Sequence, residues 1–288
     1  MAGIAFALSA ALFWAIATRL YRQMSDYWSP VGLATVKSVI SVGLFLAWFL
    51  FFGTRFWAHD WQTLAGLFVS GIIGIALGDS ALFYALYRLG ERQTLLIAET
   101  AAPILVVSLA FLLLAESITP LQLAGVVLVV LGVDWVIGLR GGAGQVDRAG
   151  ILWALLAAAC QAFGMLVSRY LLVATDISAE ESAFWRLLGA VVILPLWMFL
   201  RRETLRPLKP LSVHVSARLI IAILLGTFFG IMFLQYAVAL LPAGLAQALI
   251  ATSIIFVTLI GAIRGEIVSR TQWGGVVTAV FGVAVIVL

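Results

Sequence analysis

The chain has 288 residues, of which 64% are hydrophobic and only 10% are charged, and its mean hydropathy is +1.16. Soluble domains carry about 25% charged residues, so this composition excludes a protein whose main solvent is water. The net charge of +4 does not indicate nucleic-acid binding, because the basic residues are scattered through short loops without interleaved aromatic residues.

Continuous apolar runs predict an all-α integral membrane protein, since helices satisfy their backbone hydrogen bonds within the bilayer. A membrane β-barrel is excluded, because its strands would alternate in polarity over segments of about ten residues. The first run, from Gly3 to Ala17, has no basic segment before it and no cleavage site after it, so we interpret it as a span. A span needs about 20 mostly apolar residues. Ten transmembrane helices are predicted, at residues 3–20, 30–52, 62–87, 92–115, 120–138, 150–172, 181–200, 217–241, 243–264 and 271–288.

Residues 1–142 and 148–288 are predicted to be two related five-helix repeats. When Gly3 is aligned with Gly150, small and apolar residues of the first span recur in the sixth. Because five is odd, the second repeat enters the membrane from the opposite face, which defines inverted repeats with a substrate site between them. Further along the chain the alignment pairs Arg22 with Arg169, Lys37 with Arg186, Gly74 with Gly226, Tyr84 with Tyr236, and Glu116 with Glu266.

Loop charges predict the orientation of the chain. Ten spans place both termini on one face, and most of the 17 basic residues fall in loops of the other face. Loops rich in Lys and Arg stay in the cytoplasm. We therefore expect a multi-pass protein of the bacterial inner membrane with both termini facing away from the cytoplasm. The basic residues assigned to the cytoplasmic face are Arg19, Arg22, Arg88, Arg92, Arg140, Arg148, Arg201, Arg202, Arg206, Lys209, Arg218, Arg264 and Arg270, and those of the terminal face are Arg55 and Arg169.

Three charged residues of the first repeat fall inside spans at a similar depth. A rise of 1.5 Å per residue places Lys37, Asp79 and Glu99 roughly 10 to 12 Å below the cytoplasmic face. A charge near the bilayer centre costs at least about 2.5 to 3.5 kcal/mol, so such residues mark substrate or ion pathways. We expect them to line a cavity in which they bind the charged ends of an amino acid, while one carboxylate exchanges a proton. The alternative is a structural ion pair, with the Lys37 stem extended toward the headgroups.

In the second repeat Arg186, Gln235 and Gln247 are expected at a similar depth below the outer face, so that amides stand where the first repeat has Asp79 and Glu99. We also expect that a ligand could contact the aromatic rings, hydroxyls or amides of other residues inside the spans. For each of these residues, packing or a structural polar layer is the alternative. The predicted substrate-binding residues are Trp14, Lys37, Asp79, Tyr84, Glu99, Gln161, Trp185, Arg186, Gln235, Tyr236 and Gln247.

The fourth predicted span runs from Thr94 through Pro103 to Glu116 and is followed by a Thr-Pro pair. Together with ten spans in a duplicated chain, this pattern resembles the drug/metabolite transporter superfamily, EamA type, over the whole chain. The resemblance implies a central cavity and alternating access, and the known members include amino acid exporters such as the YddG-like proteins. Aromatic amino acid exporters carry aromatic residues just before the fourth-span proline. Here residues 99–102 read Glu-Thr-Ala-Ala, which disfavours an aromatic substrate.

Other function classes lack the residues that they need. An ATP-driven pump requires a phosphate-binding Gly-Lys-Ser/Thr loop, and neither of the two lysines, Lys37 and Lys209, stands in one. The two histidines, His59 and His214, fall in loops on opposite faces, which disfavours an enzyme or a metal site.

We therefore predict a secondary transporter, with no catalytic, metal or cofactor site, that exports small polar metabolites, amino acids being favoured. Its partners are a small-molecule substrate and the lipid bilayer. A flippase of a lipid-linked metabolite and a drug or nucleotide-sugar-type exchanger remain alternatives, and the oligomeric state is open.

Overall fold

The computed structural model describes residues 1–53, 56–137, 147–265 and 267–287. Throughout these ranges every regular element is a helix, and two elements have π-helical geometry. Of the residues named above, Arg55, Arg140 and Glu266 lie outside the described residues, as does the side chain of Arg92. In chain order the elements are α1 (Ala2–Met24), α2 (Pro30–Phe52), α3 (Trp61–Gly71), η1 (Ile72–Leu77), α4 (Gly78–Leu114), α5 (Pro120–Ile137), α6 (Arg148–Ala174), α7 (Ala179–Arg201), α8 (Val213–Ala222), η2 (Ile223–Phe229), α9 (Gly230–Leu240), α10 (Ala243–Ala251), α11 (Ser253–Ile263) and α12 (Arg270–Val287).

In the described residues, 8 helical stretches are long and apolar enough to cross a membrane. They coincide with the first four and the sixth to ninth predicted spans to within a few residues. The remaining two predicted spans correspond to the shorter apolar stretches Pro120–Trp135 and Arg270–Ile286. At 1.5 Å per residue these stretches fall short of the roughly 30 Å hydrocarbon core. The structure thus supports an all-helical membrane protein, and the count of ten spans stays a prediction.

The third and fourth predicted spans meet at a kink inside α4. Gly90 there has φ 77°, in the left-handed region that glycine enters without steric cost. The predicted break between residues 87 and 92 therefore lies where the backbone leaves helical geometry.

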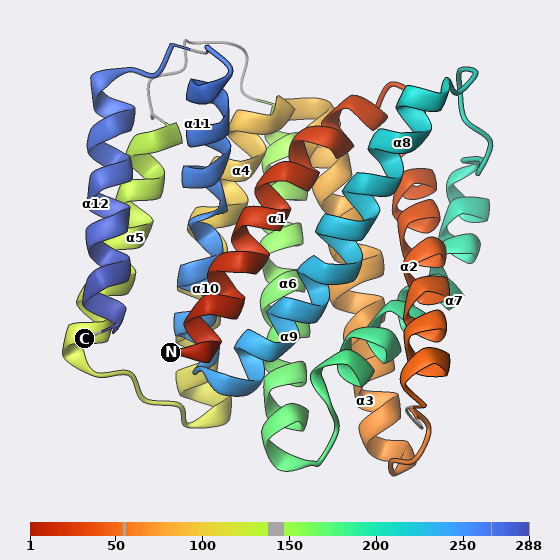
Figure 1. Ribbon diagram of the computed structural model, residues 1–288, viewed down its shortest axis with the longest axis horizontal. Coiled ribbons are helices and arrows are strands. Elements are labelled where there is room, and N and C mark those ends of the chain that lie inside the picture. The colour runs from red at the N-terminus through yellow and green to blue at the C-terminus, as the bar shows by residue number, and fades with distance from the viewer. Residues whose placement is uncertain (54–55, 138–146, 266, 288) are drawn as a thin grey trace.

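Each half begins with two long helices, followed by a span that a π segment interrupts, and the two halves interlock (Figure 1). Both termini lie at one end of the bundle, α1 runs away from that end and α6 runs toward it. A π segment interrupts the third span of each half, η1 in the first and η2 in the second. The packing is reciprocal, because α1 contacts η2 and α9 while α6 contacts η1 and α4. At one edge of the bundle α5 and α12 pack side by side.

Several helices begin at side-chain caps. At the start of α5 the backbone amide of Gln122 donates to Thr119 Oγ1, and the backbone amide of Thr119 donates to Gln122 Oε1. The same reciprocal capping box opens α12, between Ser269 and Gln272. Asp60 caps α3, and the Thr63 amide and hydroxyl that donate to it hold the pKa of its carboxyl below the usual value.

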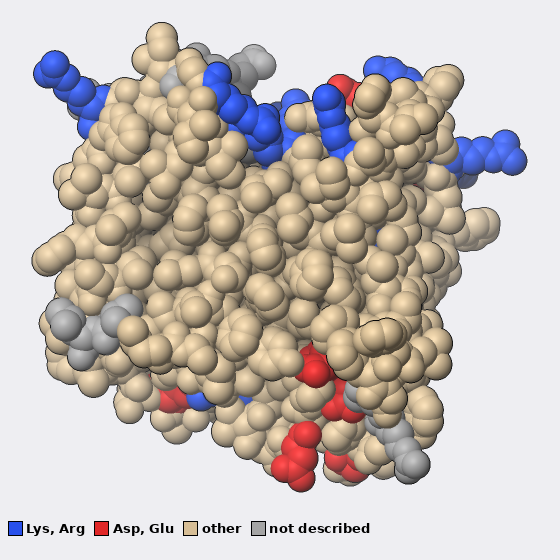
Figure 2. Space-filling model, viewed as in Figure 1, with Lys and Arg blue, Asp and Glu red and all other residues tan. Residues whose placement is uncertain are grey.

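Charged side chains separate between the two ends of the bundle (Figure 2). On the face in view, Lys and Arg gather at the end away from the termini, whereas Asp and Glu predominate at the end that carries them. We call the first the basic end and the second the termini end. Exposed residues of the basic end include Arg88, Arg201, Arg206, Lys209 and Arg270. This separation agrees with the loop assignment made from the sequence for the described residues.

Glycines allow the closest helix contacts, as small residues do in other membrane bundles. A Cβ added at Gly71 would lie 1.8 Å from the Arg186 carbonyl oxygen, and one at Gly189 would lie 2.1 Å from the Phe68 carbonyl oxygen. Because the obstacles are backbone atoms, α7 can approach α3 and η1 this closely only where glycine stands.

We expect Gly189→Ala to lower the thermal unfolding temperature of the purified protein in detergent, because overpacking costs about 1 to 3 kcal/mol. Gly43→Ala is the matched control, since Gly43 lies on α2 with no atom within 4 Å of the added Cβ. Equal unfolding temperatures for the two variants, measured by differential scanning fluorimetry, would contradict the close contact of α7 with α3.

Candidate functional site

A cavity of about 110 Å³ lies inside the bundle, and both halves of the chain line it. The first half supplies residues from α1, α2 and α4, and the second half supplies residues from α6, η2, α9 and α11. The lining residues are Trp14, Ala17, Thr18, Tyr21, Lys37, Asp79, Leu82, Phe83, Leu86, Leu95, Glu99, Gln161, Gly226, Ile231 and Ser253.

An ion pair between α2 and α4 forms part of the cavity wall. Lys37 Nζ lies 2.5 Å from Asp79 Oδ2, and the two side chains are 7% and 23% exposed. The Lys37 ammonium also lies 5.9 Å from the ring centroid of Tyr21 and 5.8 Å from that of Phe83. A carboxylate and two aromatic rings thus stabilise a cation that would otherwise be costly at this depth.

Glu99 lines the same cavity but lies outside this ion pair. Its Oε2 is buried and has no hydrogen-bond partner in the described part of the chain. The three charged residues predicted to share a cavity therefore do so, with Lys37 and Asp79 in contact and Glu99 apart from them. A carboxyl oxygen buried without a partner costs free energy, which a ligand or a bound proton would recover.

The π segment η2 is bound to α1 beside the cavity. Trp14 Nε1 donates to the Gly226 carbonyl oxygen over 2.7 Å, and the hydroxyls of Tyr21 and Thr227 are 2.8 Å apart. A Cβ at Gly226 would lie 2.4 Å from that of Ala17, so this contact requires glycine. The polar atoms of Trp14 and Tyr21 are therefore used within the protein, while their rings remain part of the wall.

The predicted polar residues of the second half lie mostly behind the lining. Gln161 faces the cavity and donates through Nε2 to Oε1 of the buried Gln247 over 3.2 Å. Gln235 is buried elsewhere, where its Oε1 accepts from Ser182 over 3.2 Å. Arg186 is 4% exposed and does not line the cavity; its guanidinium lies against Gly74 and Gly164, interacts with the lining residue Asp79, and has no hydrogen-bond partner at Nε in the described residues.

Three predicted aromatic residues belong to the ends of the bundle. Near the basic end, Tyr84 donates to Glu203 and stacks on Trp153 at 5.0 Å. Near the termini end, Tyr236 donates to Glu180 over 2.8 Å, and Trp185 donates through Nε1 to the carbonyl oxygen of residue 56 over 2.7 Å. The structure does not bring these three side chains to the cavity.

Sequence reasoning missed several lining residues, of which Tyr21 and Phe83 matter most because they hold Lys37. A signal was present in the helical spacing. Trp14, Thr18 and Tyr21 follow one another at intervals of four and three residues on α1, so they share one face. Phe83 lies four residues after Asp79 and shares its face in the same way.

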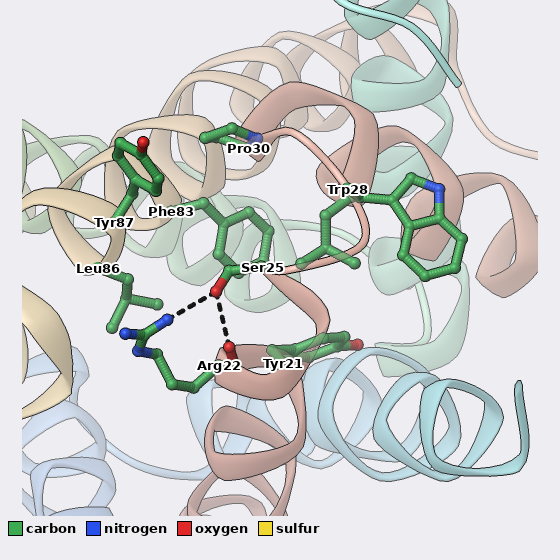
Figure 3. Close-up of a pocket in the computed structure, with 9 residues that line it drawn as sticks. Tyr21, Arg22, Ser25, Trp28, Pro30, Phe83, Leu86 and Tyr87 are labelled. Carbon is green, nitrogen blue, oxygen red and sulfur yellow. Dashed lines mark hydrogen bonds between the residues drawn. The ribbon is translucent and has the colours of Figure 1, made fainter. Parts of the chain in front are cut away.

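Three residues separate the cavity from a smaller pocket on the basic side (Figure 3). That pocket, of about 20 Å³, shares Tyr21, Phe83 and Leu86 with the central cavity. Figure 3 shows Arg22 and Ser25 at its edge, where Arg22 Nη1 donates to Ser25 Oγ and Ser25 Oγ donates to the Arg22 carbonyl, each over 2.7 Å. The Arg22 guanidinium is thus bound within its own helix end and loop.

An ion pair closes the termini end by tying four helices together. Glu116 Oε1 accepts from Arg169 Nε over 2.6 Å, and Oε2 accepts from the Ala243 amide over 2.8 Å. Arg169 Nη1 also donates to the carbonyl oxygens of Val238 and Ala239, over 2.8 and 3.0 Å. The ends of α4, α6, α9 and α10 are therefore joined through two side chains.

A bundle of apolar helices around a charged cavity, lined by both halves of the chain, is the architecture of a membrane transporter. The sequence profile of the EamA-like transporter family matches residues 1–138 and, separately, residues 148–288. The chain belongs to this family, within the drug/metabolite transporter superfamily.

The fold is shared with proteins of known structure, of which 29 chains match. One of them, titled only as the crystal structure of a protein, has a TM-score of 0.76 at 20% sequence identity, covering 98% of this chain and 95% of its own. Among curated proteins no match was found.

We expect Lys37→Met and Asp79→Asn each to destabilise the protein more than the double variant Lys37→Met/Asp79→Asn. Breaking a buried ion pair leaves one charge uncompensated and costs up to about 3 to 5 kcal/mol, whereas removing both partners can be neutral. A double-mutant cycle of thermal unfolding in detergent measures the coupling. Additive effects of the two substitutions would contradict the pairing.

Proposed function

We propose that this family member is a secondary transporter that exports small polar metabolites, amino acids being the favoured class, by alternating access through the central cavity. The observation that carries this proposal is the cavity between the two halves, with an ion pair and a separate unpartnered carboxyl in its wall. In this proposal Lys37 and Asp79 contact the charged ends of the substrate, and Glu99 contacts the substrate or exchanges a proton.

The proposal includes ten spans arranged as two inverted repeats, residues 1–142 and 148–288. The opposite directions of α1 and α6 support it, as does the π segment in the third span of each half. Reciprocal packing of α1 on η2 and of α6 on η1 is the contact pattern that a twofold axis in the membrane plane would generate.

Alternating access requires that each end of the bundle be closed by its own set of contacts. In this structure different residues make the contacts at the two ends. The termini end is held by Glu116 and Arg169, which no residue of the cavity wall joins. On the basic side Tyr21, Phe83 and Leu86 stand between the cavity and the small pocket. These separate sets of contacts support alternating access, in which one end opens while the other stays closed.

A flippase of a lipid-linked metabolite would need a lateral opening into the passage. A pocket of about 350 Å³ does lie beside α4, α5 and α10, lined by Val107, Phe111 and Leu123 among others. In the described residues it shares no lining residue with the central cavity. This separation favours a soluble substrate over the flippase, and a drug or nucleotide-sugar-type exchanger would use the same cavity.

The first test is uptake into proteoliposomes of a panel of amino acids, amines and sugar phosphates, with and without a pH gradient. We expect Glu99→Gln to lower the transport rate at least tenfold, because the substitution removes the ionisable group. Glu180→Gln is the matched control, since an amide oxygen can still accept from Tyr236 at the termini end. Unchanged rate and unchanged pH dependence in Glu99→Gln would remove Glu99 from the mechanism.

For orientation we propose a bacterial inner membrane protein with both termini outside the cytoplasm, supported by the basic end opposite the termini. A C-terminal alkaline phosphatase fusion should be active in cells and a C-terminal GFP fusion dark. Bright GFP fluorescence would reverse the assignment.

A further inference from the structure

Several polar groups around the central cavity are already hydrogen-bonded within the protein. The indole N–H of Trp14 and the hydroxyl of Tyr21 are used by Gly226 and Thr227, and the Gln161 amide donates to Gln247. Asp79 and Glu99 bring carboxylate acceptors to the wall, while the Lys37 ammonium and the hydroxyls of Thr18 and Ser253 can donate. In the described residues the Oε2 atom of Glu99 has no donor, and a donor group of a ligand would satisfy it.

The charged side chains of the cavity wall also indicate which ligand it would bind. Among the described lining residues Lys37 is the one lysine or arginine, and its ammonium is paired with Asp79 at 2.5 Å. The buried Arg186 behind the lining also interacts with Asp79. Within the described residues Glu99 has no cation partner, and its Oε2 has no donor. Among the charged side chains of the described wall, Glu99 is therefore the one with no opposite charge in contact, which favours a cation at this carboxylate.

The wall also shows how such a cation is accommodated. A carboxylate and the faces of two aromatic rings surround the Lys37 ammonium. Trp14 adds a third ring to the same cavity, and Trp has the most favourable face for a cation. Glu99 is thus a second carboxylate in a cavity lined by aromatic rings. In the described residues it has no ammonium beside it, as Asp79 has in Lys37.

We infer that the group recognised in the substrate is an ammonium held by Glu99, and that the substrate needs no carboxylate, so that small primary amines are ligands in their own right. The inference rests on the proposed transport function and, within its small polar metabolites, moves the favoured class from amino acids to amines. A volume of about 110 Å³ holds roughly four water-sized groups at about 30 Å³ each, so short amines fit it.

The test is calorimetric titration of the full-length protein in nanodiscs with four probes: ethanolamine, glycine, glycolate and choline. Ethanolamine should bind at least tenfold more tightly than glycine, because the lining cation Lys37 is already paired with Asp79 and leaves the glycine carboxylate without a partner. Glycolate should not bind measurably. Choline keeps the charge but lacks N–H donors, so it should bind more weakly than ethanolamine.

The variants Glu99→Gln and Glu99→Asp separate charge from packing. Glu99→Gln should weaken ethanolamine binding at least tenfold, Glu99→Asp should keep the preference for ethanolamine over glycine, and Glu180→Gln should match the unsubstituted protein. Glu99→Gln binding ethanolamine at full strength would overturn the inference. The comparison among the four probes needs no variant and stands even if Glu99→Gln does not fold.

Two failures are distinguishable. Binding and transport of glycine without binding of ethanolamine would overturn the ammonium inference and leave the transport proposal in place. Absence of uptake for every solute in the proteoliposome panel would overturn the transport proposal, and the inference with it.

Discussion

A charge buried among apolar helices must have a partner or face a space that can supply one, and this constraint organises the molecule. Lys37 meets it through Asp79 and two rings, and Arg169 meets it through Glu116 and the last carbonyls of α9. The first pair forms part of the cavity wall, and the second closes one end of the bundle. Glu99 does not meet it within the described residues, which makes its carboxyl the most informative group of the site.

The two halves carry different side chains at matching sequence positions. Lys37 and Arg186 occupy matching positions on α2 and α7, yet the sequence position that matches Asp79 is Ile231. The second half thus supplies no carboxylate of its own for Arg186. The guanidinium of Arg186 lies over Gly74 and Gly164 and interacts with Asp79 of the first half. The charged part of the cavity therefore comes from the first half, while the second half contributes amide, hydroxyl and apolar surface.

The sequence predicts the helices well because apolar length is a local property, and the break at Gly90 was visible as a cluster of charge and glycine. It also identifies Lys37, Asp79 and Glu99, because charged residues inside spans are rare. It does not separate Tyr84, which lies near the basic end, from Tyr21, which lines the cavity. Depth along a span can be counted from its ends, but the direction of a side chain depends on the tilt, the kinks and the π turns of the helix.

The π segments give the third span of each half a property that a plain α-helix lacks. One turn of a π-helix holds more residues than a turn of an α-helix, so each segment stores surplus chain length. One stored residue corresponds to a rotation of about 100° between the flanking helical pieces. Conversion of such a turn to α geometry turns one end of the span against the other while every peptide group keeps a partner, which is the condition for any rearrangement in lipid. Because Gly226 of η2 is also the acceptor for Trp14, such a twist is mechanically coupled to the wall of the cavity.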